Sequence, residues 1–174
     1  MTRLRAAVSV LALVVAVLLG GCTQAPNTTA VVNGVVIQES SVNEMAEALV
    51  SSGAISTYAV ARSSASAKLI AGEVARQVAR QNGITLAPAD ISSLSTSNPT
   101  YATFLASPLG EEFAMNHTDA VQVTSEVSDW QAEFAAVNVD LNPRYGTWPA
   151  FLAELASTTA DTPPTGSMSV VSGS

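Results

Sequence analysis

Apolar and polar residues alternate near both ends of the chain, and this alternation is typical of short strands. Residues 30–37 read AVVNGVVI, two β-branched runs separated by Asn33-Gly34. Because Asn-Gly strongly favours a two-residue hairpin turn, the segment predicts two strands. Residues 137–142, VNVDLN, alternate in the same way and predict a third strand. It should end before Pro143, since proline cannot donate to a strand ladder.

Two long helices are expected after the predicted hairpin. The first begins at Ser40 or Ser41, either of which is a good N-cap, and ends near Gly53. The second runs from about Ser56 to Asn82, where a following glycine favours a helix end. Their apolar faces, at the spacing of a helix, are expected to hold Val42, Met45, Ala46 and Leu49, and Tyr58, Ala61, Ala65, Leu69, Ile70, Val74 and Val78.

Shorter helices are expected in the second half of the chain. Pro88 is expected to start one, and Asn98 and Ser107, each a cap residue followed by proline, to start two more. A last helix is expected from about Thr124 to Val137, with Val127, Trp130 and Phe134 on one side. Together the elements predict an α+β fold, mostly α, in which a small antiparallel sheet joins the N-terminal and C-terminal strands.

The segment after the third predicted strand, NPRYGTW, is expected to close the fold. Gly146 lets the backbone turn, so that Trp148 folds back onto the helices. Arg144 has three possible roles, which are an ion pair with an acid of the helical body, a stack on an aromatic ring, and a contact with a partner. The residues expected to take part in this closure are Asn33, Gly34, Asn142, Pro143, Arg144, Tyr145, Gly146 and Trp148.

The N-terminus resembles a bacterial lipoprotein signal. Two arginines precede the apolar run 6–19, which is shorter than the roughly 20 residues of a membrane-spanning helix. The run leads into Leu19-Gly20-Gly21-Cys22, which resembles a lipobox. This resemblance implies removal of residues 1–21 and attachment of diacylglycerol and palmitate at Cys22, which would anchor the protein to the outer face of the cytoplasmic membrane. An ordinary signal peptide that ends near a cysteine is the alternative.

Segments of small and polar residues flank one expected domain. Residues 22–29 are expected to be a tether, 30–155 the domain and 156–174 a disordered tail, because the flanks bury too little apolar area to offset chain entropy. Without residues 1–21, five basic residues stand against fourteen acidic ones, a net charge of about −9. Such a chain has no basic stripe to neutralise phosphates, so nucleic acid is not expected as a partner.

Candidate catalytic and metal-binding residues are few. The sole histidine, His117, is expected to be a solvated helix residue, since no Gly-x-Ser-x-Gly elbow offers it a nucleophile. The sole cysteine excludes an intramolecular disulfide, and the scattered carboxylates lack the spacing of a calcium loop. We therefore expect no enzyme, no metal site and no cofactor.

Three stretches in order, AVVNGVVIQESSVNEM, KLIAGEVARQVARQNGITLAPADI and VNVDLNPRYGTW, resemble the N-terminal chaperone domain of SurA and PrsA-type foldases. The likeness is to the actinobacterial lipoprotein branch and covers roughly residues 30–150. It implies an extracytoplasmic helical module that holds unfolded or nascent secreted polypeptides. It implies no isomerase activity, because that activity belongs to a separate parvulin domain in the family and this chain has no room for one.

Two functions are therefore expected. One is a lipid-anchored holdase, which needs an adaptable apolar surface. The alternative is a non-catalytic structural or adaptor lipoprotein with one dedicated envelope or secretion partner. The residues expected to bind clients are Met45, Leu49, Tyr58, Phe104 and Phe113, although core packing explains each of them equally well.

Overall fold

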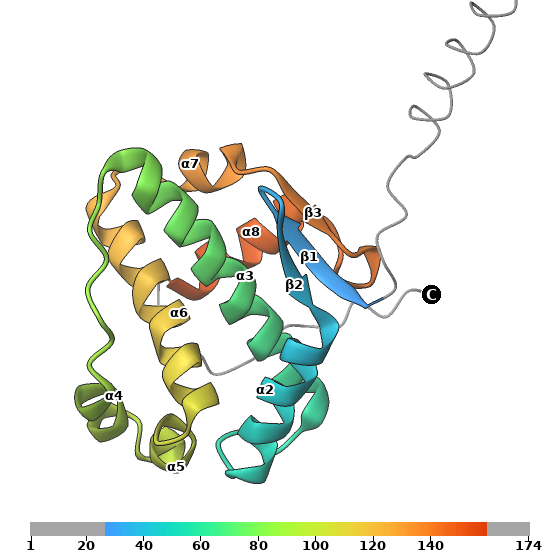
Figure 1. Ribbon diagram of the computed structural model, residues 1–174, viewed down its shortest axis with the longest axis vertical. Coiled ribbons are helices and arrows are strands. Elements are labelled where there is room, and N and C mark those ends of the chain that lie inside the picture. Colours follow the sequence, from blue (N-terminus) through green and yellow to red (C-terminus); the bar gives the residue numbers. More distant parts are fainter. Residues whose placement is uncertain (1–26, 160–174) are drawn as a thin grey trace, which may run out of the picture.

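A three-stranded antiparallel sheet lies beside a body of helices in the computed structural model, which describes residues 27–159 (Figure 1). The strands are β1 (Thr28–Val32), β2 (Val35–Gln38) and β3 (Val139–Leu141), in the order β2-β1-β3. The expected class, α+β and mostly α with a small antiparallel sheet, is therefore confirmed.

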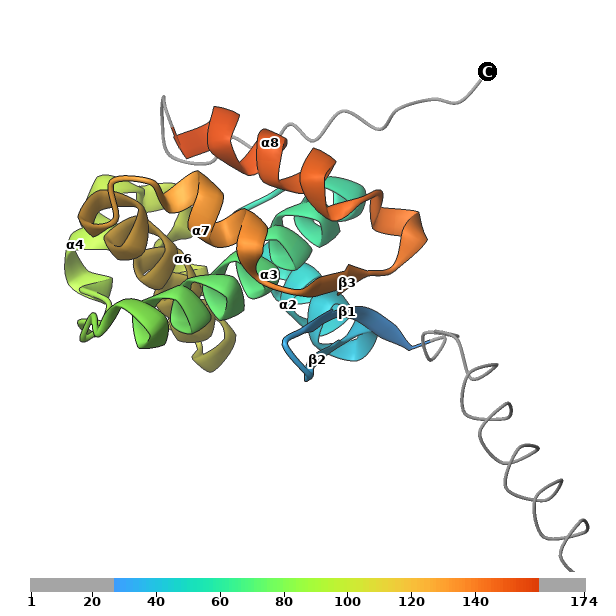
Figure 2. The same cartoon turned by 90° about the horizontal axis from the view of Figure 1, so that it is seen from above.

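Helices make up most of the remaining chain. They are α2 (Glu39–Ser51), α3 (Tyr58–Asn82), α4 (Ile91–Ser97), the 3₁₀ helix η1 (Pro99–Tyr101), α5 (Ala102–Leu105), α6 (Pro108–Glu126), α7 (Trp130–Ala136), the 3₁₀ helix η2 (Pro143–Tyr145) and α8 (Trp148–Thr159). None of these helices is long and apolar enough to cross a membrane. The sheet and α4 lie towards opposite ends of the body (Figures 1 and 2).

The sheet joins the two ends of the domain, as its sequence predicts. Asn33 and Gly34 both have positive φ, 45° and 86°, which is the conformation of the tight turn expected between β1 and β2. On the other side of β1, Ala30 pairs with Leu141 and Val32 with Val139. β1 begins at Thr28, so the last two residues of the expected tether, 22–29, belong to the sheet and are buried.

Helix α3 is the central element of the core, packed between α2 and α6. Its buried face holds the predicted Ala61, Ala65, Leu69, Ile70, Val74 and Val78. Tyr58 was expected on this face but is 42% exposed, because it lies in the first turn of α3 and its hydroxyl reaches Asn43 on α2. Helix α3 ends at Gly83, whose φ of 68° confirms the predicted left-handed stop.

The starts of α2 and α4 differ from the prediction. α2 begins at Glu39, one or two residues before the expected caps Ser40 and Ser41, because the Glu39 amide donates to Asn27 O and fixes the entry of the chain. α4 begins at Ile91 rather than Pro88, since the Asp90 side chain accepts from the Ser93 amide.

The two Pro-marked starts have different outcomes. The Ser107 side chain caps α6 by accepting from the Gly110 amide, as expected. Asn98 precedes η1 but makes no side-chain cap hydrogen bond there.

The C-terminal part of the domain contains one helix more than expected. The predicted helix from Thr124 to Val137 is wrong at its start, because α6 continues to Glu126 and α7 occupies only Trp130–Ala136. α8 then follows the closing segment and buries Trp148, Phe151 and Leu152. The expected domain boundary at 155 therefore falls within α8, which continues to Thr159. The predicted signal, Cys22 and the rest of the predicted tail lie outside the described residues.

Candidate functional site

Glu39, the first residue of α2, is the centre of a polar cluster that joins four elements. Its carboxylate accepts hydrogen bonds from Thr29 on β1 (2.9 Å), from Arg62 on α3, and from the Tyr145 hydroxyl on η2 (2.9 and 3.0 Å). The Arg62 guanidinium also donates to the Tyr145 hydroxyl at 2.8 Å. We call these four residues, Glu39, Thr29, Arg62 and Tyr145, the Glu39 cluster.

Arg144 lies at the edge of the Glu39 cluster and has two of its three expected roles at once. Its Nη1 is 3.8 Å from Glu39 Oε1, and its guanidinium carbon is 5.9 Å from the Tyr145 ring centroid. The ion pair and the stack on an aromatic ring are therefore both present, while a contact with a partner stays a prediction.

Hydrogen bonding decides the ionisation of this carboxyl. Burial raises the pKa of Glu39, but the hydrogen bonds from Arg62, Thr29 and Tyr145 outweigh burial and hold the pKa below its usual value. The pKa of Tyr145 is raised by burial and by its hydrogen bond to Glu39. A carboxylate so fully engaged is a poor general base, and its hydrogen bonds join the closing segment to the sheet and the helical body.

The turn after η2 explains how the closing segment reaches the core. Gly146 has a φ of 91°, which a residue with a side chain rarely adopts, and Trp148 then packs with 8% of its surface exposed. Asn142 supports the turn from before it, since its side chain accepts from the Arg144 amide and donates to Thr28 O. These contacts hold residues 142–148 against β1 and the core.

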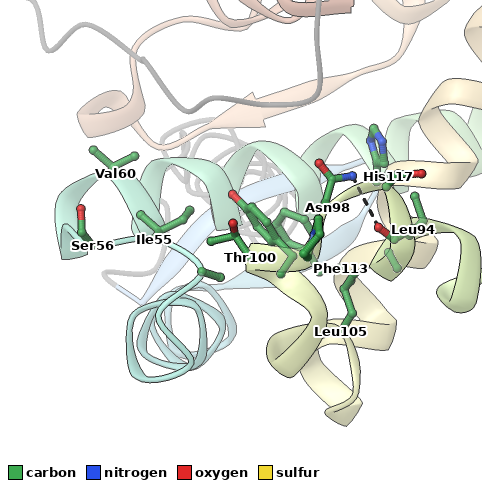
Figure 3. A pocket seen from close by; sticks show the side chains of 14 residues that line it. Ile55, Ser56, Val60, Leu94, Asn98, Thr100, Leu105, Phe113 and His117 are labelled. Carbon is green, nitrogen blue, oxygen red and sulfur yellow. Dashed lines mark hydrogen bonds between the residues drawn. The ribbon is translucent and has the colours of Figure 1, made fainter.

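A cavity of about 610 Å³ is lined by side chains from two separate stretches of the chain, residues 54–60 and 94–117 (Figure 3). Its walls come from the link between α2 and α3, from the segment α4-η1-α5, and from α6. Ile55, Val60, Leu94, Leu105 and Phe113 give it a largely apolar lining. We call this cavity the apolar pocket.

His117 is part of the lining of the apolar pocket, and its side chain contacts that of Lys68. Lys68 Nζ on α3 lies 3.1 Å from His117 Nδ1 on α6. Burial lowers the pKa of His117 to about 4, assisted by the nearby Lys68 charge, and burial lowers the pKa of Lys68 to about 8. The prediction of a solvated His117 is wrong, because α6 turns this residue towards α3 and the pocket.

The residues expected to bind clients are mostly core residues. Met45, Leu49 and Phe104 are at most 1% exposed, and only Tyr58 lies on the surface. Phe113 is the exception among the buried ones, since it lines the apolar pocket while its ring packs edge-on against Phe104. The five residues therefore form no common surface, and apolar spacing alone could not separate a pocket wall from the core.

The pocket contains residues that sequence patterns did not single out. Ile55, Val60 and Leu105 belong to elements that come together only in the folded chain. The sequence singles out His117 as the sole histidine, but it is 49 positions from Lys68, the sole lysine, and their pairing depends on how α3 packs on α6.

No cluster of three or more His, Cys, Asp or Glu side chains that could hold a metal occurs within residues 27–159. Comparisons with protein-family models, with curated proteins and with solved structures found no match to this chain. Inference about its function therefore rests on the fold and on the apolar pocket.

Proposed function

We propose that this protein is a lipid-anchored, extracytoplasmic, chaperone-like holdase without isomerase activity. It binds apolar segments of unfolded or nascent secreted polypeptides reversibly, and the apolar pocket is the site where their side chains enter. Its anchor is the lipid on Cys22, and its fold is a SurA N-terminal-like helical domain.

The observation that carries this proposal is the apolar pocket itself. At about 610 Å³ it lies within the size range of ligand pockets and has room for several large apolar side chains. Its lining mixes aliphatic and aromatic side chains with the polar Ser97, Asn98 and Thr100 at one side. Such a lining favours apolar groups without demanding one particular shape.

One wall of the pocket is suited to adaptable binding. α4 and η1 contribute no buried residue, although both line the pocket. Elements with few buried apolar contacts open at low free energy, so this wall can move to admit side chains of different sizes. The opposite wall, on α6, includes the buried Phe113 and Ala114 and provides a fixed surface.

Suppression of aggregation tests the proposal. The mature protein is added in several-fold molar excess to a reduced, unfolding secreted protein, and light scattering is followed. Ser97→Trp fills the mouth of the pocket and should abolish suppression, whereas Ser92→Trp on the same helix, at an exposed residue outside the pocket, should preserve it. No suppression by the folded, unsubstituted protein would contradict a holdase function.

An adaptor lipoprotein with one dedicated envelope or secretion partner is the second candidate, and one observation favours it. β2 is an edge strand, and its Val35 and Val36 are 44% and 47% exposed. An exposed apolar edge can pair with a strand of a partner. Affinity capture separates the two functions, since a holdase yields many clients and an adaptor yields one stoichiometric partner.

A further inference from the structure

The Lys68–His117 pair gives the apolar pocket a polar group with a defined direction. A protonated Lys68 ammonium can donate hydrogen bonds but cannot accept them, so His117 Nδ1 must be the acceptor in the 3.1 Å contact. The imidazole is neutral at neutral pH, because burial holds its pKa at about 4. The one N–H proton of the neutral ring is therefore on Nε2. His117 is a hydrogen-bond donor through Nε2, with the positive charge of Lys68 next to its Nδ1.

Lys68 has no acidic partner among the residues that the structure describes. None of the five ion pairs there includes it, although each of the four arginines in 27–159 takes part in at least one. A partly buried cation without a counter-charge is costly, and burial already lowers the pKa of Lys68 to about 8.

The lining of the pocket is also free of negative charge. None of its residues is Asp or Glu, in a chain that has fourteen acidic residues. An anionic group that entered would therefore meet the His117 donor and the Lys68 charge without a carboxylate of the lining to repel it. The pocket is thus complementary to an apolar group that carries a negative charge.

We propose that the apolar pocket selects polypeptide segments in which a large apolar side chain adjoins an acidic residue, whose carboxylate accepts a hydrogen bond from His117 and offsets the charge of Lys68. This inference rests on the proposed function and adds a sequence preference to it. A hydrogen bond to an ionised acceptor is stronger than one between two neutral groups, so the acidic residue adds both affinity and direction. A fatty acid also joins an apolar group to a carboxylate, and the test below distinguishes a fatty acid from a polypeptide as the ligand.

Two matched peptides test the preference. One contains Leu-Phe-Asp and the other Leu-Phe-Asn, each within an acetylated and amidated Gly-Ser frame, and titration calorimetry measures their Kd with the mature protein. The Asp peptide should bind about fivefold to tenfold more tightly, since the two differ only in the charge of one side chain. Lys68→Met should remove this difference, because it keeps the apolar stem and deletes the charge.

Arg80→Met is the matched control for the loss of a positive charge. Arg80 lies on the same helix, is exposed and is not part of the pocket lining, so this variant should keep the preference for Asp. Circular dichroism and melting of both variants establish that each is folded. Laurate is titrated in parallel as a carboxylate without a peptide.

The outcomes separate the two proposals. Equal binding of the two peptides overturns the acidic preference and leaves a holdase for apolar segments. A preference that survives Lys68→Met also overturns it, because the discrimination then lies elsewhere. Binding of laurate with no binding of either peptide overturns both the preference and the polypeptide as ligand.

Discussion

The Tyr145 hydroxyl lies 2.9 Å from Glu39 Oε1 and 3.0 Å from Oε2, although the two residues are 106 positions apart in sequence. This contact connects η2, near the end of the domain, to the first residue of α2. With the β1–β3 pairing next to it, it closes a chain whose other contacts are largely between helices. The closing segment is thus held by a sheet on one side and by a partly buried carboxylate on the other.

Removing the Tyr145 hydroxyl should loosen this closure. Tyr145→Phe keeps the ring but deletes a hydrogen bond to a charged acceptor, so we expect a loss of about 2 kcal/mol in the free energy of unfolding. Urea denaturation measures it. Tyr58→Phe is the matched control, because that hydroxyl makes a 3.3 Å exposed contact with Asn43 and its loss should change stability by less than about 0.5 kcal/mol. Equal effects of the two substitutions would contradict a special role for Tyr145.

Trp148 should stabilise the domain through its apolar area alone. Its side chain is buried, and its Nε1 has no hydrogen-bond partner among the described residues. Trp148→Ala should therefore cost about 3 kcal/mol or more, whereas Trp148→Phe should cost less than about 1.5 kcal/mol. Thermal melting of both variants checks this. A Phe variant as unstable as the Ala variant would show that the indole nitrogen has a partner after all.

The sheet and most of the helical body follow from local sequence signals. Asn33-Gly34 defines the hairpin, Gly83 ends α3 and Ser107 caps α6, and each is a local effect of backbone conformation or side-chain hydrogen bonding. The partnership of β3 with β1 also follows, because a two-stranded hairpin needs further strands. α8 was missed, since Trp148 was read as the end of a turn rather than as the first residue of a helix.

The candidate site is a different case, because its residues depend on tertiary packing. Met45 and Leu49 have the same helical spacing whether they face the core or a groove, and the structure places them in the core. The pairing of Lys68 with His117 depends on the packing of α3 on α6, which no local pattern encodes. The Lys68–His117 pair could therefore not be predicted from the sequence.

Gly72 should be intolerant of a side chain although it lies inside a helix. A Cβ there would overlap the side chain of Asn116, whose Oδ1 accepts from Arg76 Nη1 at 2.8 Å. Gly→Ala normally stabilises a helix interior by about 1 kcal/mol. Here Gly72→Ala should instead destabilise the domain by about 2 kcal/mol, because α3 and α6 must separate.

The sign of this change is the test. Chemical denaturation of Gly72→Ala should show a lower midpoint than the unsubstituted protein. Ser63→Ala, a substitution to alanine on the same helix at a half-buried residue, serves as the control and should change stability by less than about 0.5 kcal/mol. A stabilised Gly72→Ala variant would mean that α3 and α6 do not approach as closely as described.

Stability should fall as the pH is lowered from about 6.5 to about 4, because the pKa of His117 drops from 6.5 to about 4 on folding. Within that window the unfolded chain binds a proton that the folded chain does not, so acid favours unfolding, by roughly 3 kcal/mol across the window. His117→Gln should remove this dependence. Glu39, whose pKa is lowered from 4.5, contributes stability that is present above pH 4.5 and is lost as the pH falls below it, so its loss adds only at the acid end of the series and equally in both proteins. Urea midpoints of both proteins, measured from pH 7 to pH 4, test this prediction. If the midpoint depends on pH as strongly in His117→Gln as in the unsubstituted protein, His117 is solvated and titrates normally.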